Sequence, residues 1–218
     1  PKTGLPISLK ILLADLKEGA RYVLNDRCFR IIVVIAVTAN FFGSGMNAVF
    51  LPFCLGKGLD VVQYGYLMSL QSISALIGTI VIGTLNIKSE LRIKLMLFGF
   101  PLSSLLFAVC YSMQTFNTLA LSFLITFFVS AVANAILNAA FMLVIPREKR
   151  AMISGFIMMA SSGGQALSSL VFGLVAEFVD LSLLGTVSSL ISILPFALMF
   201  IYPEVQKRFL QAELSPEL

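Results

Sequence analysis

The chain alternates between long apolar runs and short polar islands. From Leu95 to Pro146 it contains no Asp, Glu, Lys or Arg. At about 1.5 Å of rise per residue, this run is far longer than one hydrocarbon core of roughly 30 Å requires, so it must hold two membrane-crossing helices. The same reasoning along the whole chain predicts six membrane-spanning helices, at residues 31–51, 64–85, 95–111, 118–145, 152–176 and 183–201.

Turn and capping residues mark the ends of these predicted helices. Gly56 and Gly58 predict a flexible turn after the first span, and Asp60 followed by Gln63 resembles a capping box that starts the second. Pro146 should end the fourth span, because the residue before a proline disfavours the helical conformation. The pattern predicts an all-α membrane protein.

An amphipathic segment precedes the first span. Leu9, Leu12 and Leu16 recur at helical spacing, whereas Lys17 and Arg21 occupy other positions. This pattern predicts a surface helix that lies at the headgroup boundary, packs against protein, or serves only as a linker.

The chain therefore divides into three segments. Residues 1–28 are predicted to be a cytoplasmic amphipathic linker segment, residues 29–203 a six-helix transmembrane bundle, and residues 204–218 a cytoplasmic tail. Because the chain starts at Pro1 without a Met, we expect it to be the downstream portion of a longer polypeptide.

The amino-acid composition excludes several classes of function. The chain is 58% hydrophobic and 12% charged, with a mean hydropathy of +0.97, whereas soluble domains carry about 25% charged residues. It has no His, which excludes catalytic triads and metal or haem sites that need imidazole. Its three Cys stand at no metal-like spacing and are read as packing residues or reduced thiols. We expect neither an enzyme nor a cofactor.

The distribution of basic residues predicts the orientation in the membrane. Of the 15 Lys and Arg, 14 lie in the N-terminal segment, the second and fourth loops and the tail, and only Lys57 lies in an alternate loop. The positive-inside rule then places both termini in the cytoplasm. The net charge of +4 reflects topology and anionic lipid, so no nucleic-acid partner is expected.

Polar side chains within the spans are uncharged and unevenly distributed. The first, second, fourth and fifth spans carry amides near the middle of the membrane, whereas the third and sixth carry none. We interpret the four amide-bearing helices as the lining of a wet cavity, with the third and sixth packed outside. The alternative is that these groups bond helix to helix. The candidate cavity-lining residues are Asn40, Ser44, Asn47, Gln71, Ser74, Ser130, Asn134, Asn138, Ser161 and Gln165.

Several short motifs resemble one transporter family. The chain resembles the C-terminal six-helix half of a major facilitator superfamily permease, in the branch of macrolide-efflux and siderophore-exporter proteins. The resembling residues are the segment 15–19, Tyr64 with Gly65, Gly78 and Gly83, and the run 145–150 followed by Gly155. The loop motif after Gly83 departs from the family pattern, because Ile87 stands where an Asp is expected.

The resemblance implies a secondary-active export permease of the inner or plasma membrane. It would move amphipathic drug-, macrolide- or siderophore-like molecules as a multidrug antiporter, together with a missing N-terminal six-helix half from the same polypeptide. The implied partners are the lipid bilayer, a small-molecule substrate and a proton as coupling ion, although the acidic residues for proton coupling are not in this half. The alternative is a six-helix scaffold or partner subunit without transport activity. An intramembrane hydrolase is disfavoured, because its His, Asp or Glu groups are missing from the spans.

Overall fold

A computed structural model describes residues 9–214, and within them every regular element is a helix. Six stretches are long and apolar enough to cross a membrane, which confirms the predicted all-α fold with six spans. The sixth is split into α7 and α8. The helices are α1 (Leu9–Asn25), α2 (Arg27–Gly56), α3 (Val61–Thr84), α4 (Ser89–Ser112), α5 (Phe116–Val144), the 3₁₀ turn η1 (Arg147–Lys149), α6 (Arg150–Val175), α7 (Leu181–Ile191), α8 (Ile193–Ile201) and α9 (Pro203–Leu214).

The turn and capping residues predicted at the helix ends are confirmed. Asp60 accepts a hydrogen bond from the Gln63 amide at 2.7 Å, and the Gln63 side chain accepts one from the Asp60 amide at 3.1 Å, which completes the capping box. Gly58 has φ +78°, a left-handed conformation that glycine adopts at little cost. The fourth span ends at Val144, two residues before Pro146.

The sixth span is broken at Ser192, which the apolar pattern does not predict. Pro195 follows three residues later and has no amide hydrogen to donate. Its ring also crowds the carbonyl of the residue four positions earlier, which is Ile191. The helix therefore stops at Ile191 and restarts at Ile193.

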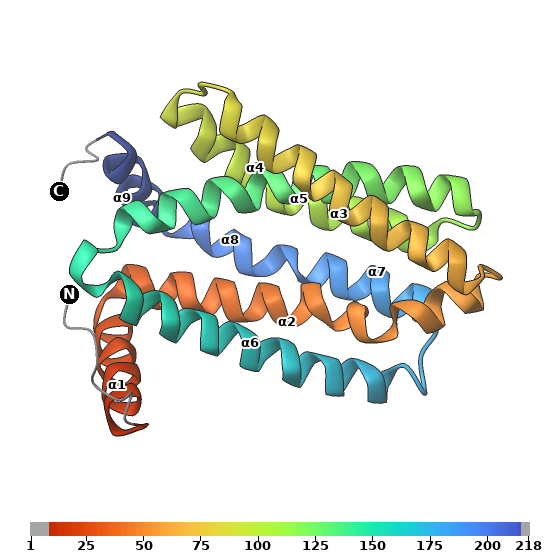
Figure 1. The fold of residues 1–218 in the computed structure, drawn as a ribbon, viewed down its shortest axis with the longest axis horizontal. Coiled ribbons are helices and arrows are strands. Elements are labelled where there is room, and N and C mark those ends of the chain that lie inside the picture. The colour runs from red at the N-terminus through yellow and green to blue at the C-terminus, as the bar shows by residue number, and fades with distance from the viewer. Residues whose placement is uncertain (1–8, 215–218) are drawn as a thin grey trace.

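The helices form two layers with a third element between them (Figure 1). In one layer α6 packs along α2, with α1 across their start. In the other, α5 packs between α3 and α4. The pair α7 and α8 contacts both layers, through α2 and through α4. No broad contact joins α5 to α2 or α6 among the described residues, so the two layers stand apart along one side.

Both end segments pack against the bundle. The predicted amphipathic segment folds as α1, and its Gly19 lies so close to α6 that an added Cβ would meet the Met152 carbonyl oxygen at 3.1 Å. The predicted tail contains α9, whose Val205 and Phe209 are fully buried. Arg208 of α9 also pairs with Asp26 at 2.7 Å, so this helix is fastened to the start of α2.

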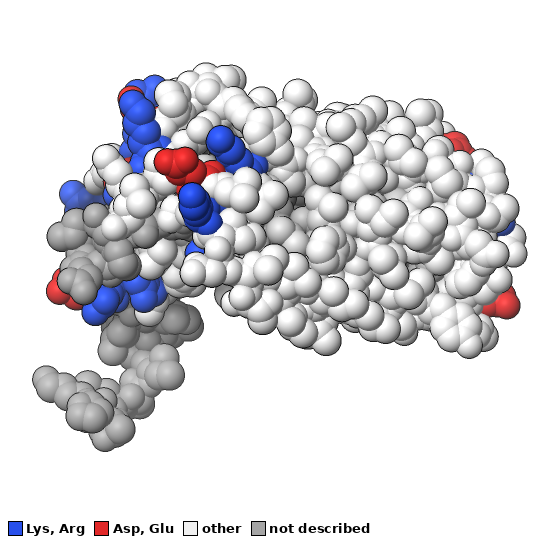
Figure 2. All heavy atoms as spheres, turned by 90° about the horizontal axis from the view of Figure 1, so that it is seen from above, with Lys and Arg blue, Asp and Glu red and all other residues white. Residues whose placement is uncertain are grey.

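Charge is confined to the ends of the bundle. Figure 2 shows Lys and Arg gathered at one end, an uncharged body, and a few charged side chains at the other end. We call the first the basic end, since it holds the loops at residues 85–88 and 145–149 and the helices α1 and α9. The uncharged body is the part that a bilayer would cover.

Candidate functional site

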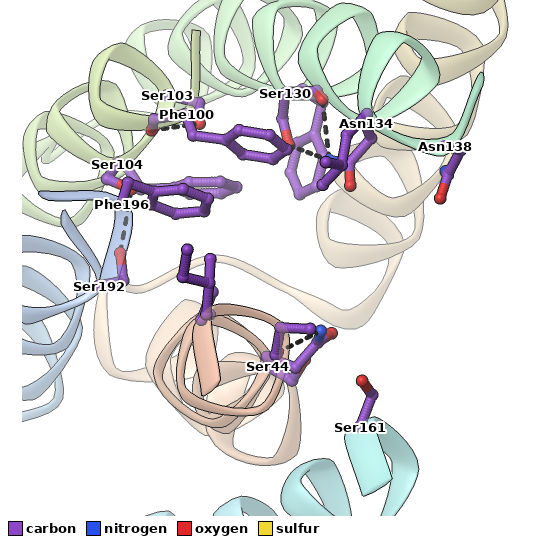
Figure 3. Close-up of a pocket in the computed structure, with 18 of the residues that line it drawn as sticks. Ser44, Phe100, Ser103, Ser104, Ser130, Asn134, Asn138, Ser161, Ser192 and Phe196 are labelled. Carbon is purple, nitrogen blue, oxygen red and sulfur yellow. Dashed lines mark hydrogen bonds between the residues drawn. The ribbon is translucent and has the colours of Figure 1, made fainter. Parts of the chain in front are cut away.

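A cavity of about 610 Å³ lies between the two layers. Its wall is formed by side chains from α2, α3, α4, α5, α6 and α8, with Phe209 of α9 added at the basic end. In Figure 3, α4 and α5 lie on one side of the cavity, α2 and α6 on the other, and Asn138 and Ser161 stand across from each other. The separation of the two layers thus leaves a space large enough for a small molecule.

Eight of the ten predicted lining residues border this cavity. They come from the first, second, fourth and fifth spans, as the amide pattern indicated. Asn47, Asn134 and Asn138 are exposed, whereas Asn40 and Gln71 are half-buried. The eight residues are Asn40, Ser44, Asn47, Gln71, Ser130, Asn134, Asn138 and Ser161.

Two of these amides are oriented by their own helices. The Asn40 side-chain nitrogen donates to the Ala36 carbonyl at 2.7 Å, and that of Asn134 donates to the Ser130 carbonyl at 2.9 Å. A carbonyl can only accept, so each amide must use its NH₂ group for this bond. The amide oxygen of Asn134 remains available to another partner, whereas that of Asn40 accepts from Gln165.

The remaining two predicted lining residues, Ser74 and Gln165, do not border the cavity. Ser74 is buried and donates to the Leu124 carbonyl, which joins α3 to α5. Gln165 donates from Nε2 to Asn40 Oδ1 at 3.0 Å, which joins α6 to α2. For these two residues the lining prediction is wrong. Both side chains bond to a neighbouring helix, as the alternative interpretation of the polar residues expects. Three- and four-residue spacing places residues on one face of a helix, but it does not say which neighbour that face meets.

The prediction that the third and sixth spans stay outside the cavity is also wrong. Phe100, Ser103 and Ser104 of α4 line it, together with Ser192 and Phe196 of the sixth span. These spans carry no amide, so amide counting missed them. The pair Ser103–Ser104 and Ser192, three residues before Pro195, are the sequence signals that were available, but serine is common in membrane helices.

Aromatic packing brings the two layers together at the end opposite the basic end. Phe50 of α2 stacks on Phe123 of α5 with ring centroids 5.0 Å apart and an interplanar angle of 19°. At the basic end, Phe29 of α2 meets Phe141 of α5 edge to face at 6.4 Å. The cavity is therefore bounded by aromatic contacts toward both membrane surfaces.

The lining residues carry no formal charge. Within residues 9–214, no three His, Cys, Asp or Glu side chains lie close enough together to hold a metal ion. The thiols of Cys54 and Cys110 are buried and that of Cys28 is half-buried, and all three are free. Dispersed dipoles and aromatic faces are the means by which this wall can hold a ligand.

Comparison with known protein families agrees with this architecture. The sequence profile described as Major Facilitator Superfamily matches residues 33–216, which is most of the chain and includes all six spans except the start of the first. The chain belongs to the Major Facilitator Superfamily. Neither the search of curated proteins nor the search of solved structures gave a match. Members of this superfamily are membrane transporters, so the chain is a multi-pass membrane protein of a transporter family.

Proposed function

We propose that this chain is the C-terminal six-helix half of a secondary-active export permease that moves amphipathic small molecules by alternating access. The observation that carries the proposal is the uncharged cavity between layers that stand apart along one side. In this superfamily the two six-helix halves are related by an axis along the membrane normal, and the substrate site lies at their interface. When only one of the two halves is present, one wall of the cavity at this interface remains.

The chemistry of the wall supports an amphipathic substrate. Exposed amides such as Asn134 and Asn138 border the cavity, while buried rings such as Phe100, Phe123 and Phe196 form its inner surface. A macrolide, drug or siderophore-like molecule presents the same combination of polar groups and apolar surface. Because no acidic side chain lines the cavity, we assign proton coupling to the missing N-terminal half.

We further propose that the protein resides in the inner or plasma membrane with both termini in the cytoplasm. Two observations support this orientation, the 14-to-1 split of basic residues and their gathering at one end in Figure 2. Single cysteines at Ser89 and Lys57, placed in a variant that lacks Cys28, Cys54 and Cys110, test it. A membrane-impermeant maleimide added to intact cells should label the Lys57→Cys variant only. Labelling of both variants from outside would contradict the topology.

The function is tested by efflux. Cells that express the chain joined to its N-terminal half should expel an amphipathic dye, whereas cells that express the 218-residue chain alone should not, because one wall of the cavity is then absent. Membrane insertion of both forms is checked by immunoblotting of membrane fractions. Efflux by the chain alone would show that it works as a dimer of identical halves and would refute the assignment as one half of a longer protein.

The second candidate function is a six-helix scaffold or partner subunit without transport activity. The bonds that Ser74, Gln165 and Ser168 make to neighbouring helices favour it, since they show polar groups used for packing. If the chain is a scaffold, substitution of cavity-lining residues should leave every transport phenotype of the cell unchanged. Export therefore separates the two candidates.

A further inference from the structure

The part of the cavity formed by α4 and by the break in the sixth span has a chemistry of its own. We call it the deep wall and define it by Phe100, Ser103, Ser104, Ser192 and Phe196. All five residues are at most 8% exposed, yet all border the cavity. Figure 3 shows Ser104, Ser192 and Phe196 grouped together, on the side of the cavity away from Asn138 and Ser161.

The hydroxyl protons of Ser192 and Ser103 in the deep wall are already used. Ser192 Oγ lies 2.7 Å from the Ser189 carbonyl and 3.0 Å from Ser104 Oγ. Ser192 is the donor in both contacts, so its single proton is shared between the Ser189 carbonyl and Ser104 Oγ. Ser103 donates to the Phe100 carbonyl at 2.9 Å.

The groups that Ser103 and Ser192 leave to a ligand are therefore acceptors. Each of the three hydroxyl oxygens keeps a lone pair after these bonds are made. A ligand O–H or N–H group can bond to them without breaking any internal bond. A ligand that brings only acceptors leaves the Ser103 and Ser192 oxygens facing other oxygens, which costs the desolvation free energy of both groups.

The apolar part of the deep wall is aromatic. Phe100 of α4 and Phe196 of α8 stack with centroids 4.4 Å apart and an interplanar angle of 7°. The two rings are held parallel and both border the cavity. A further ring placed against the pair gains offset-stacked or edge-to-face contact, which is worth more than the same area of aliphatic surface.

We propose that the deep wall is a ligand subsite that receives an aromatic ring carrying an O–H or N–H donor. The serine oxygens take the donor and the Phe100–Phe196 pair takes the ring. This inference rests on the proposed function in one respect, that the occupant is the transported molecule. It adds the substrate class, namely phenol-like or aniline-like amphipathic compounds.

The test compares two probes that differ in a single donor. 2-Naphthol carries the O–H, and 2-methoxynaphthalene carries the same ring system with the proton replaced by a methyl group. Binding of tritiated 2-naphthol to the full polypeptide in lipid nanodiscs is measured by scintillation proximity, with 2-methoxynaphthalene as competitor and empty nanodiscs as background. We expect 2-naphthol to bind about fivefold to tenfold more tightly, the effect of one buried hydrogen bond.

The serine variants decide whether the deep wall is responsible. The double variant Ser104→Ala with Ser192→Ala should bring the affinity ratio of the two probes to about one. The matched control is Ser188→Ala with Ser189→Ala, because both of these hydroxyls are buried, both donate to the Gly185 carbonyl and neither borders the cavity. The control should keep the preference. An unchanged ratio in the Ser104 and Ser192 double variant overturns the proposal, as does failure of 2-naphthol to bind the unmodified protein.

A second pair of variants tests the aromatic part. Phe100→Leu should weaken 2-naphthol binding about threefold to tenfold through loss of the ring contact. Phe98→Leu is the control, because Phe98 lies two positions away on α4 and is 62% exposed on the outside of the bundle. Equal affinities in these two variants would overturn the proposal.

Efflux of an amphipathic dye is measured separately on the same protein. Selective binding of 2-naphthol without any efflux would refute the proposed transport function and leave the subsite standing. Efflux of the dye by a protein that binds the two probes equally would refute the subsite and leave the proposed transport function standing.

Discussion

Replacing Asp26 should loosen both the start of the first span and the attachment of α9. The Asp26 carboxylate accepts from the Cys28 amide at 2.8 Å and from the Phe29 amide at 3.3 Å, so it caps the N-terminus of α2. It also accepts from Arg208 Nη1 at 3.0 and 2.7 Å. The Arg208 guanidinium lies over the Phe29 ring, 4.9 Å from its centroid. One side chain thus joins two elements that are far apart in sequence.

Two substitutions separate the two roles. Asn is as good an N-cap as Asp, so Asp26→Asn should lose only the ion pair. The paired side chains are 28% and 37% exposed, and solvent screening at that exposure leaves about 1 kcal/mol. Asp26→Ala also loses the cap, which adds about 1 kcal/mol. The expected losses of unfolding free energy are therefore about 1 and about 2 kcal/mol, and the first corresponds to roughly a fivefold change in the folded-to-unfolded ratio.

The assay is reversible unfolding in mixed detergent and SDS micelles, arranged as a double-mutant cycle of Asp26→Asn with Arg208→Gln. The two single losses should overlap, so that the double variant is about 1 kcal/mol more stable than their sum predicts. Lys207→Gln, at an exposed neighbouring position, is the control and should cost almost nothing. Strict additivity would refute the ion-pair argument, and equal stability of Asp26→Ala and Asp26→Asn would refute the capping argument.

The same contact predicts a pH dependence. Burial raises the pKa of Asp26, but the hydrogen bond and charge of Arg208 and the amides at the start of α2 outweigh it, so the pKa lies below its ordinary value. A carboxyl group whose pKa is lower in the folded state stabilises the protein at every pH above the pKa of the unfolded state, which is about 3.9 for Asp. That stabilisation is lost as the pH falls through the pKa of the folded state. The coupling should be constant from pH 7 to about pH 5 and decline below about pH 4.

Other expected outcomes concern the membrane interior. Asn134→Leu should leave stability nearly unchanged but alter the drug-resistance profile of the full-length protein, because the amide oxygen of Asn134 faces the cavity without an internal partner. Gln165→Leu should instead lower the free energy of unfolding by about 0.6 kcal/mol through loss of the bond to Asn40. Paired measurement of thermal stability and resistance profile checks both, and a destabilised Asn134→Leu with an unchanged profile would contradict the cavity role. Gly45→Ala should cost about 1–3 kcal/mol, because a Cβ there would overlap the Phe172 ring between α2 and α6; a thermal shift equal to that of Gly43→Ala, where the Cβ meets nothing within 4 Å, would contradict it.

The sequence by itself determined the elements of this protein. A bilayer leaves the backbone no water to bond with, so an apolar run of about 20 residues has to be a helix, and its length counts the crossings. Local chemistry then set helix ends that depend on neighbours in sequence, such as the Asp60–Gln63 capping box and the stop before Pro146. The amides of the first, second and fourth spans also identified most of the polar cavity wall, because a polar group in hydrocarbon needs a partner or water wherever it lies.

Only the tertiary structure decided which face of each helix meets the cavity. Lipid and the aromatic part of the cavity are equally apolar, so hydropathy gives Phe98 and Phe100 the same environment, although one faces outward and the other lines the deep wall. Ser74 and Gln165 share the spacing of true lining residues, but the helices beside them supply partners from distant parts of the chain. The docking of α9 through Arg208 and Asp26, 182 positions apart, likewise depends on the assembled bundle. In a membrane, where apolar burial no longer distinguishes inside from outside, contacts between helices make that choice.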